Sequence, residues 1–289
     1  MKLTHFFDSV VVLDCLGESE TQTARRLRDS VLTPAQRLDR ALKVEYRWVA
    51  DQTVLQEALQ VVEDFAKSGH APILHLEAHG NVDGLRLPSD DPVHWEFFKQ
   101  AFARINESWA CNLLVVMAAC SGAYLAKIVR PTERAPVWAV VGPMEDVSGG
   151  ILQDAMSEFY WTLLRTLNGS NAIAAMNASS VERGGPFRVF TAEMIFCSAF
   201  ERYLKDQNPE VVRLQEDELV RRAVLARGVH EAVARAQVQS LMRDHRRWYE
   251  HLRQYHLMID LFPANAGRFQ LSFENCLGAE EGAPPQNQA

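Results

Sequence analysis

The sequence predicts an α/β fold, in which a mainly parallel sheet is sandwiched by helices and followed by a helical appendage. Short apolar runs rich in β-branched residues alternate with longer segments of helical periodicity, as in βαβ units. After the turn signal Asn208-Pro209, only helical periodicity remains. We therefore expect an α/β domain at residues 1–208, a helical region at 209–276 and a disordered tail at 277–289.

The predicted strands are apolar runs that end in small or turn-forming residues. They span 9–16, 42–49, 72–77, 113–117, 137–141 and 187–190. The run at 113–117 is the most apolar, which is typical of a strand buried on both faces. The run at 137–141 ends at Gly142-Pro143, and this pair indicates a turn.

The predicted helices lie between these strands and repeat apolar side chains every three or four positions. Pro34 lies just beyond the first helix, Gly69 ends the second, and Pro92 starts the third. Ser148 is placed to cap the helix after the fifth strand. The helices span 21–32, 52–67, 92–108, 151–167, a segment ending near 203 and, in the helical region, 210–226 and 229–257.

Composition and charge narrow the functional classes. The 289 residues, 47% of them hydrophobic, are enough for one large core. A formal charge of −7 disfavours binding to nucleic acid or to an anionic membrane surface. No apolar run reaches the ~18 residues that a membrane span needs. The sequence has neither a P-loop nor a GxGxxG pattern, so we expect no cofactor.

The five cysteines are odd in number, widely spaced and without a CxxC pair. This pattern favours free thiols in a reducing compartment over a disulfide scaffold. The N-terminus shows no signal-peptide pattern. We therefore expect a cytoplasmic protein.

Two predicted strands end in small-residue turns that carry reactive side chains. One ends in His79-Gly80 and the other in Cys120-Ser121-Gly122. Because the carboxyl ends of parallel strands lie at one edge of the sheet, we expect the imidazole and the thiol on the same rim. An imidazole can take the proton of a thiol and return it to an amine leaving group. The amides of Gly80 and Cys120 are then the candidate oxyanion hole.

The order of these motifs resembles that of the clan CD cysteine peptidases, which include caspases, separase and the bacterial CHAT peptidases. The resemblance covers about residues 9–205. Ala119-Cys120-Ser121-Gly122 is similar to the core of the caspase pentapeptide Q-A-C-[RQG]-G, and His79 lies 41 residues upstream of Cys120. Ala118 stands where caspases carry glutamine, which argues against a caspase-like preference for aspartate. The resemblance implies a caspase-like fold and a cysteine endopeptidase of the CHAT and separase branch.

The resemblance also suggests a specificity site and a biological setting. The acidic turn after the fifth strand resembles the region that lines the specificity pocket in this branch, so Asp146 is the candidate to receive a basic P1 side chain. Small bacterial members often act in defence or death pathways, which implies a protein or peptide substrate and an activating protein partner. Glu77 faces the same side of its strand as His79 and is a candidate to orient the imidazole or line the substrate pocket. Asp14 ends the first strand on the same rim.

Several alternatives remain beside this interpretation. Cys120 alone is equally consistent with a buried structural thiol, and the whole chain with a catalytically silent scaffold that binds a partner. His75 and His79 would stand about 13 Å apart in an extended strand, too far to share one zinc ion. A hydrolase nucleophile elbow is disfavoured because no histidine follows Cys120 before the helical region.

The helical region has its own alternatives. Amphipathic packing onto the α/β body is the default for its apolar positions. A regulatory lid, or a partner surface made of arginines interleaved with aromatic residues, is a further possibility. The residues of that surface would be Arg243, Arg246, Arg247, Arg253, Trp248, Tyr249 and Tyr255.

Overall fold

The computed structural model describes residues 6–39, 41–179, 185–205 and 209–277. Contacts divide this part of the chain into two compact units. The first, which we call the α/β unit, comprises residues 6–130 and 135–192, and the second, the helical unit, comprises 131–134 and 193–277, both with the gaps just given. The expected boundary lies after 208, whereas the contacts change after Ala192. Most of the expected disordered tail lies outside the described residues.

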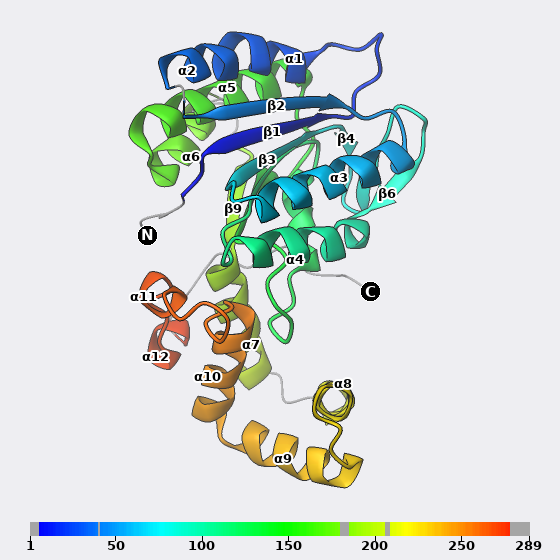
Figure 1. The fold of residues 1–289 in the computed structure, drawn as a ribbon, viewed down its shortest axis with the longest axis vertical. Helices are drawn as coiled ribbons and strands as arrows, with labels where there is room; N and C mark the ends of the chain where they lie inside the picture. Colours follow the sequence, from blue (N-terminus) through cyan, green and yellow to red (C-terminus); the bar gives the residue numbers. More distant parts are fainter. Residues whose placement is uncertain (1–5, 40, 180–184, 206–208, 278–289) are drawn as a thin grey trace. The chain divides into compact units, whose positions relative to one another are not determined.

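A six-stranded sheet forms the centre of the α/β unit (Figure 1). Its first five strands in spatial order are parallel, and β9 is antiparallel to β8. This arrangement confirms the predicted α/β class with a mainly parallel sheet flanked by helices. In spatial order the strands are β2 (Lys43–Trp48), β1 (Ser9–Asp14), β3 (Pro72–Glu77), β7 (Leu114–Ala118), β8 (Ala139–Pro143) and β9 (Phe187–Thr191).

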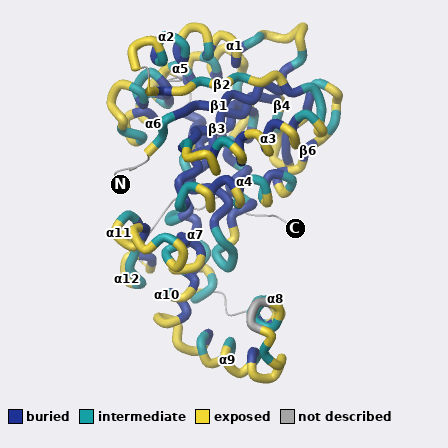
Figure 2. Tube along the Cα trace, viewed as in Figure 1, coloured by how far each residue is buried: buried dark blue, intermediate teal, exposed yellow. Residues whose placement is uncertain are grey.

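Burial explains why these runs form strands. Every residue of β1, β3, β7 and β8 is buried, as expected for parallel strands covered on both faces (Figure 2). The edge strand β2 has no fully buried residue. The apolar runs therefore locate the central strands of the sheet.

Helices cover both faces of the sheet. Helices α3 (Gln52–Lys67) and α4 (Lys99–Ser108) pack together on one face (Figure 1). On the other lie α1 (Thr23–Leu27), with the π-helical turn Arg28–Leu32 and α2 (Thr33–Leu38) after it, α5 (Gly149–Thr166) and α6 (Gly169–Ala178). Ser148 caps α5 as predicted, since its side chain accepts from the Ile151 amide.

A second, three-stranded sheet lies at the end of β3. It contains β4 (His79–Gly80), β5 (Gly84–Arg86) and β6 (Pro92–His94), all antiparallel. The prediction that Pro92 starts a helix is therefore wrong. Pro92–His94 pairs with β5 instead, and α4 begins only after a 3-10 turn at Trp95–Phe98.

The described part of the helical unit is mainly helical. Its helices are α7 (Ala192–Lys205, whose first residue belongs to the α/β unit), α8 (Pro209–Arg227), α9 (Glu231–Arg243), α10 (His245–His256), α11 (Asn265–Arg268) and α12 (Phe273–Cys276). The single helix predicted over 229–257 is two helices. Asp244 has an extended ψ and accepts from the Arg247 amide, so it ends α9 and caps α10.

An aromatic core holds the helical unit together. Phe196 and Phe200 of α7 pack against Trp248 and Tyr249 of α10. Trp248 and Tyr249 are buried within the helical unit, so these two rings do not form an exposed aromatic surface. Arg253 pairs with Glu250 within the same helix.

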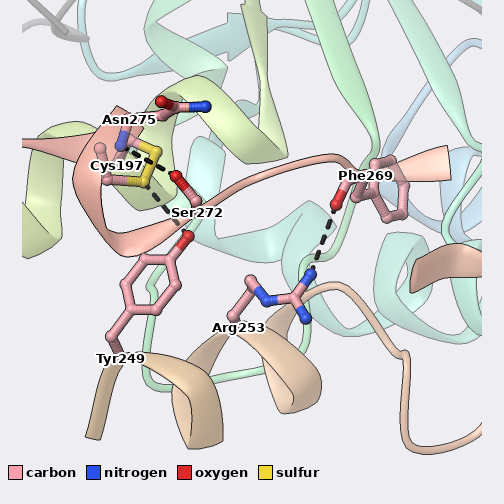
Figure 3. Close-up of a disulfide and its surroundings, with 7 residues drawn as sticks. Cys197, Tyr249, Arg253, Phe269, Ser272 and Asn275 are labelled. Atoms are coloured by element: carbon pink, nitrogen blue, oxygen red, sulfur yellow. Dashed lines mark hydrogen bonds between the residues drawn. A yellow bond between two sulfur atoms is a disulfide. The ribbon is translucent and has the colours of Figure 1, made fainter. Parts of the chain in front are cut away.

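A disulfide joins Cys197 of α7 to Cys276 of α12 inside this core (Figure 3). The Tyr249 hydroxyl lies 3.6 Å from the Cys276 sulfur. The expectation of five free thiols is therefore wrong for this pair, because the fold brings together two cysteines that are 79 residues apart. Cys15, Cys111 and Cys120 are not part of a disulfide. Across the described segments, none of the helices combines the length and apolar character required of a bilayer span.

Candidate active site

The turns that carry His79 and Cys120 meet at the carboxyl edge of the main sheet. Glu77 of β3 is in register with Ala118 of β7, and the Ala78 amide donates to the Ala118 carbonyl at 3.3 Å. A Cβ added to Gly80 would lie only 2.5 Å from the Cys120 carbonyl oxygen. The His79-Gly80 turn therefore packs directly on the backbone of Cys120, and only glycine fits at position 80.

The backbone around Cys120 makes a sharp turn. Ser121 has a φ of 55°, in the left-handed region that non-glycine residues rarely adopt. A Cβ on Gly122 would lie 2.9 Å from the Met117 carbonyl oxygen, and one on Gly142 would lie 3.0 Å from the same atom. These close approaches let the chain reverse immediately after β7, which leaves Cys120 half-buried at the sheet edge.

The Cys120 sulfur contacts the peptide of Val147, in the turn after β8. The Val147 amide donates to Sγ at 3.4 Å, and the thiol lies 3.6 Å from the Val147 carbonyl oxygen. The Ser121 amide donates to the Glu145 carbonyl at 3.2 Å and holds this turn against the cysteine turn. The sulfur therefore accepts a hydrogen bond from the turn just ahead of the N-terminus of α5.

His79 is half-exposed and has a carboxylate partner. Its Nε2 lies 2.8 Å from Oε2 of Glu20, and the two side chains are 52% and 40% exposed. Glu20 belongs to the loop between β1 and α1. Sequence reasoning missed this residue because a glutamate in an irregular loop has no motif around it. The imidazole thus has Nε2 on Glu20 and Nδ1 available for another partner.

Glu77 does not make the direct contact with the His79 imidazole that an orienting carboxylate is expected to make. Its carboxyl is 3% exposed, accepts from the Thr23 hydroxyl and lies 3.4 Å from Nε2 of His75. The alternation of side chains does place Glu77 and His79 two residues apart. However, β3 ends at Glu77 and His79 already belongs to the second sheet, so the two side chains meet different neighbours.

Asp14 is also enclosed. Its carboxylate accepts from the Tyr46 hydroxyl at 2.5 Å and from the Leu16 amide at 3.1 Å. Burial raises the pKa of Asp14, and these two bonds offset part of the effect. Burial and the nearby Asp14 raise the pKa of Tyr46 to about 12. A direct substrate contact needs an exposed carboxylate, which neither Asp14 nor Glu77 provides.

The two amides expected to form an oxyanion hole are those of Gly80, which pairs with Leu85 in the small sheet, and of Cys120, which lies outside any strand. Asn81 donates to Gly84 across the β4–β5 turn, so His79 faces Arg86 in the next hydrogen-bonded pair. Gly80 therefore occupies a non-hydrogen-bonded position, and its N–H points away from β5. Within the described ranges, no protein group accepts from the Cys120 amide.

Asp146 lies in the turn that touches Cys120. It is exposed and immediately precedes Val147, whose peptide contacts the sulfur. For the residues that the structure describes, no cluster of three or more His, Cys, Asp or Glu side chains could hold a metal ion. His75 is fully buried, with Nδ1 3.3 Å from the Tyr160 hydroxyl.

Comparisons with known proteins found similarity to solved structures. No protein-family model and no curated protein sequence matches this chain. A solved structure that is similar to it is the complex of the RgpB pro- and mature domains from Porphyromonas gingivalis. The TM-score is 0.42 and the identity 14%, over 64% of this chain and 47% of that chain. The match therefore spans about half the length of the RgpB chain.

Proposed function

We propose that the α/β unit is a cysteine endopeptidase of the clan CD, caspase-like type, with Cys120 as nucleophile and His79 as general base. The observation that carries this proposal is the packing of the His79-Gly80 turn on the Cys120 backbone, at the carboxyl edge of a parallel sheet. The proposal rests on the residues of this chain and not on its similarity to the RgpB complex.

The proposed reaction has two steps. His79 takes the thiol proton, and Cys120 Sγ attacks the scissile carbonyl carbon while the amides of Gly80 and Cys120 donate to the developing oxyanion. The carbon–nitrogen bond then breaks, and His79 returns its proton to the leaving amine. In the second step a water molecule, deprotonated by His79, attacks the thioester carbonyl. The carbon–sulfur bond then breaks, the product leaves with its new carboxyl group, and His79 returns the proton to the Cys120 sulfur.

Glu20 supplies the group that orients the base. A carboxylate on Nε2 favours the tautomer with the proton on Nε2, which leaves the lone pair of Nδ1 for the thiol proton. The carboxylate also stabilises the imidazolium that forms when the thiol loses its proton. We assign Glu20 a positioning role, since it contacts the base and not the substrate.

We further propose a preference for Arg or Lys at P1. Asp146 is exposed one residue from the peptide that contacts Cys120, and Glu145 is exposed beside it. Among the pairs within 4.0 Å in the described chain, neither carboxylate has a cation partner, so both remain available to a basic side chain. Membership of the CHAT and separase branch, and action on a protein in a bacterial defence pathway after activation by a partner, belong to this proposal through the sequence resemblance.

Covalent labelling tests the proposal. A peptidyl acyloxymethyl ketone with Arg at P1 is expected to modify wild-type protein at Cys120, as located by peptide mass spectrometry. Cys120→Ala is expected to abolish labelling, and His79→Ala to slow it strongly. Peptides with Asp or Leu at P1 are expected to label more slowly.

The outcome also separates the enzyme from its alternative. Absence of labelling in wild-type protein, tested across a P1 library and in extracts of its native host that contain an activating partner, would support a catalytically silent scaffold and overturn the enzyme. Labelling that is fastest with Asp at P1 would retain the enzyme and reject the basic preference.

A further inference from the structure

A row of buried polar side chains runs through the α/β unit beneath the candidate site. The Thr23 hydroxyl of α1 donates to the Glu77 carboxyl of β3, whose other oxygen lies 3.4 Å from Nε2 of His75. Nδ1 of His75 lies 3.3 Å from the Tyr160 hydroxyl of α5. All four side chains are buried, and burial together with the charge of Glu77 raises the pKa of Tyr160.

One assignment of protons satisfies the whole row. Tyr160 donates to Nδ1 of His75, Nε2 of His75 donates to Glu77, and Thr23 donates to the second oxygen of the same carboxyl. Buried polar groups cost stability relative to an apolar core of the same shape. The row therefore serves to fix the positions of the elements that it joins.

Glu77 accepts hydrogen bonds from both ends of the loop that contains Glu20. At one end, the Cys15 amide donates to the Glu77 carbonyl oxygen at 2.8 Å. At the other end, Thr23 opens α1 and donates to the Glu77 side chain. Glu77 also lies two residues before His79 on the same stretch of chain. One residue thus links the loop that carries the orienting carboxylate to the segment that carries the imidazole.

The loop between these two hydrogen bonds contains a turn of its own. The Glu20 amide donates to the Gly17 carbonyl at 3.0 Å, and Nε2 of Gln22 donates to the carbonyls of Gly17 at 2.8 Å and Glu20 at 3.2 Å. The turn is therefore a compact unit whose placement depends on its ends. A shift of the Thr23 end moves Glu20 relative to His79.

We propose that Glu77, acting through Thr23, is a positioning residue that sets the Glu20–His79 pair. This inference rests on the proposed function for its catalytic meaning, but its structural content is the tautomer and orientation of His79. Glu77 does not contact the imidazole or a substrate. Its role is exerted through the β1–α1 loop, and His75 and Tyr160 hold the carboxyl in place from the other side.

The test removes one hydroxyl. Thr23→Val keeps the shape of the side chain but breaks the bond to Glu77, and Thr23→Ser restores a hydroxyl. Thr191→Val is the matched control, because Thr191 is a fully buried threonine of the same unit on the distant strand β9. Far-UV circular dichroism and thermal unfolding establish that each variant is folded.

The first readout does not depend on activity. Two-dimensional NMR of the ring nitrogens reports the tautomer of His79, which the Glu20 contact is expected to hold with the proton on Nε2. Thr23→Val is expected to shift His79 towards the tautomer mixture of Glu20→Ala, whereas Thr23→Ser and Thr191→Val keep the wild-type spectrum. A His79 spectrum unchanged in Thr23→Val would overturn the inference.

The second readout is kinetic. A displacement of the orienting group by a fraction of an ångström is expected to lower kcat about tenfold in Thr23→Val, with KM nearly unchanged. In the Glu20→Ala background, the same change is expected to cost almost nothing, because both substitutions break one chain of contacts. A full additional loss in that background would reject coupling. If wild-type protein is never labelled at Cys120, the proposed function fails, while the NMR result still decides the positioning role.

Discussion

The two units of the molecule differ in what lies around their most notable groups, the reactive turns in one and the disulfide in the other. The α/β unit buries Asp14, His75 and Glu77 at or near the edge where its reactive turns lie, and each has hydrogen-bond partners. The helical unit instead buries stacked aromatic rings around the disulfide between Cys197 and Cys276. The first arrangement defines directions and distances, whereas the second supplies apolar burial and a covalent link. We therefore assign the proposed reaction to the α/β unit. We expect the stability of the helical unit to depend on its disulfide.

The first prediction, with the largest expected effect, concerns removal of the proposed general base, His79. His79→Ala is expected to lower the rate of Cys120 labelling by roughly 10²- to 10⁴-fold, because general acid–base catalysis contributes about that much. His94→Ala, an exposed histidine of the same small sheet, is the control. Stopped-flow alkylation measures both rates. Equal rates in the two variants would remove His79 from the reaction.

The second prediction concerns the disulfide of the helical unit. Replacing both Cys197 and Cys276 by Ala is expected to lower the free energy of unfolding of this unit by roughly 4 kcal/mol, since a long loop is no longer closed in the unfolded chain. Hydrogen exchange followed by mass spectrometry should show faster exchange in α7, α10 and α12. Exchange in β1, β3 and β7 should not change.

Reduction provides the control for this experiment. Dithiothreitol is expected to destabilise the helical unit of the wild-type protein but not that of the double variant. Loss of protection in the central strands on reduction would contradict an effect confined to the helical unit.

The third prediction concerns the contact between the two reactive turns. Gly80→Ala places a methyl group 2.5 Å from the Cys120 carbonyl oxygen, so the backbone must shift. We expect a loss of about 1–3 kcal/mol of stability, which is typical of overpacking, together with slower labelling of Cys120. Gly149→Ala is the matched control, because its added Cβ meets nothing within 4 Å. Urea unfolding and labelling measure both effects, and equal behaviour of the two variants would argue against the contact.

The fourth prediction concerns specificity. Asp146→Ala is expected to lower the rate with Arg at P1 about fivefold relative to Leu at P1, the effect of a partly exposed ion pair of about 1 kcal/mol. Glu145→Ala tests whether the effect belongs to this position or to the acidic turn as a whole. The ratio of kcat/KM for the two peptides is the measurement. An unchanged ratio in Asp146→Ala would remove this residue from the P1 site.

The smallest expected effect is on the pH dependence of stability. It differs in sign between Asp8, just before β1, and Asp14, the last residue of β1. Burial opposes ionisation of Asp8, but hydrogen bonds from His70, Ser9 and Ala71 outweigh it and lower the pKa of Asp8 below its ordinary value of 3.8. Its stabilising effect is therefore present above pH 3.8 and is lost as the pH falls through the lowered folded-state pKa. The pKa of Asp14, at the other end of the strand, is raised, so its contribution has the opposite sign.

Urea unfolding between pH 2 and pH 6 checks this prediction. Asp8→Asn is expected to be less stable than wild type above pH 3.8, and the difference should shrink as the pH falls. The exposed Asp154→Asn serves as control. A difference that stays constant over this range would contradict the lowered pKa.

The sequence predicts the central strands well because local apolar runs determine them. The six strands of the main sheet lie within one or two residues of their predicted ends, and the cap at Ser148 is where the pattern places it. The positions of His79 and Cys120 follow from the same reasoning, since both come directly after such runs. Their catalytic roles stay predictions.

Features that depend on contacts distant in the sequence could not be predicted in this way. Glu20 meets His79 across 59 residues, and Cys197 meets Cys276 across 79. The small sheet of β4, β5 and β6 has strands of two or three residues, too short for periodicity to show. Glu77 illustrates the same limit. Strand alternation predicts which face of the sheet its side chain lies on, but it does not predict that Thr23 of α1 donates to its carboxyl.

His79 lies in the small sheet, whereas Cys120 lies in the turn after a strand of the main sheet. The surroundings of the sulfur are set by the main sheet and the turn after β8. The reach of the imidazole is set by the hairpin of β4 and β5. In the proposed mechanism, a ligand that binds this hairpin would change the position of the base and, through the packing of Gly80 on Cys120, the position of the nucleophile as well.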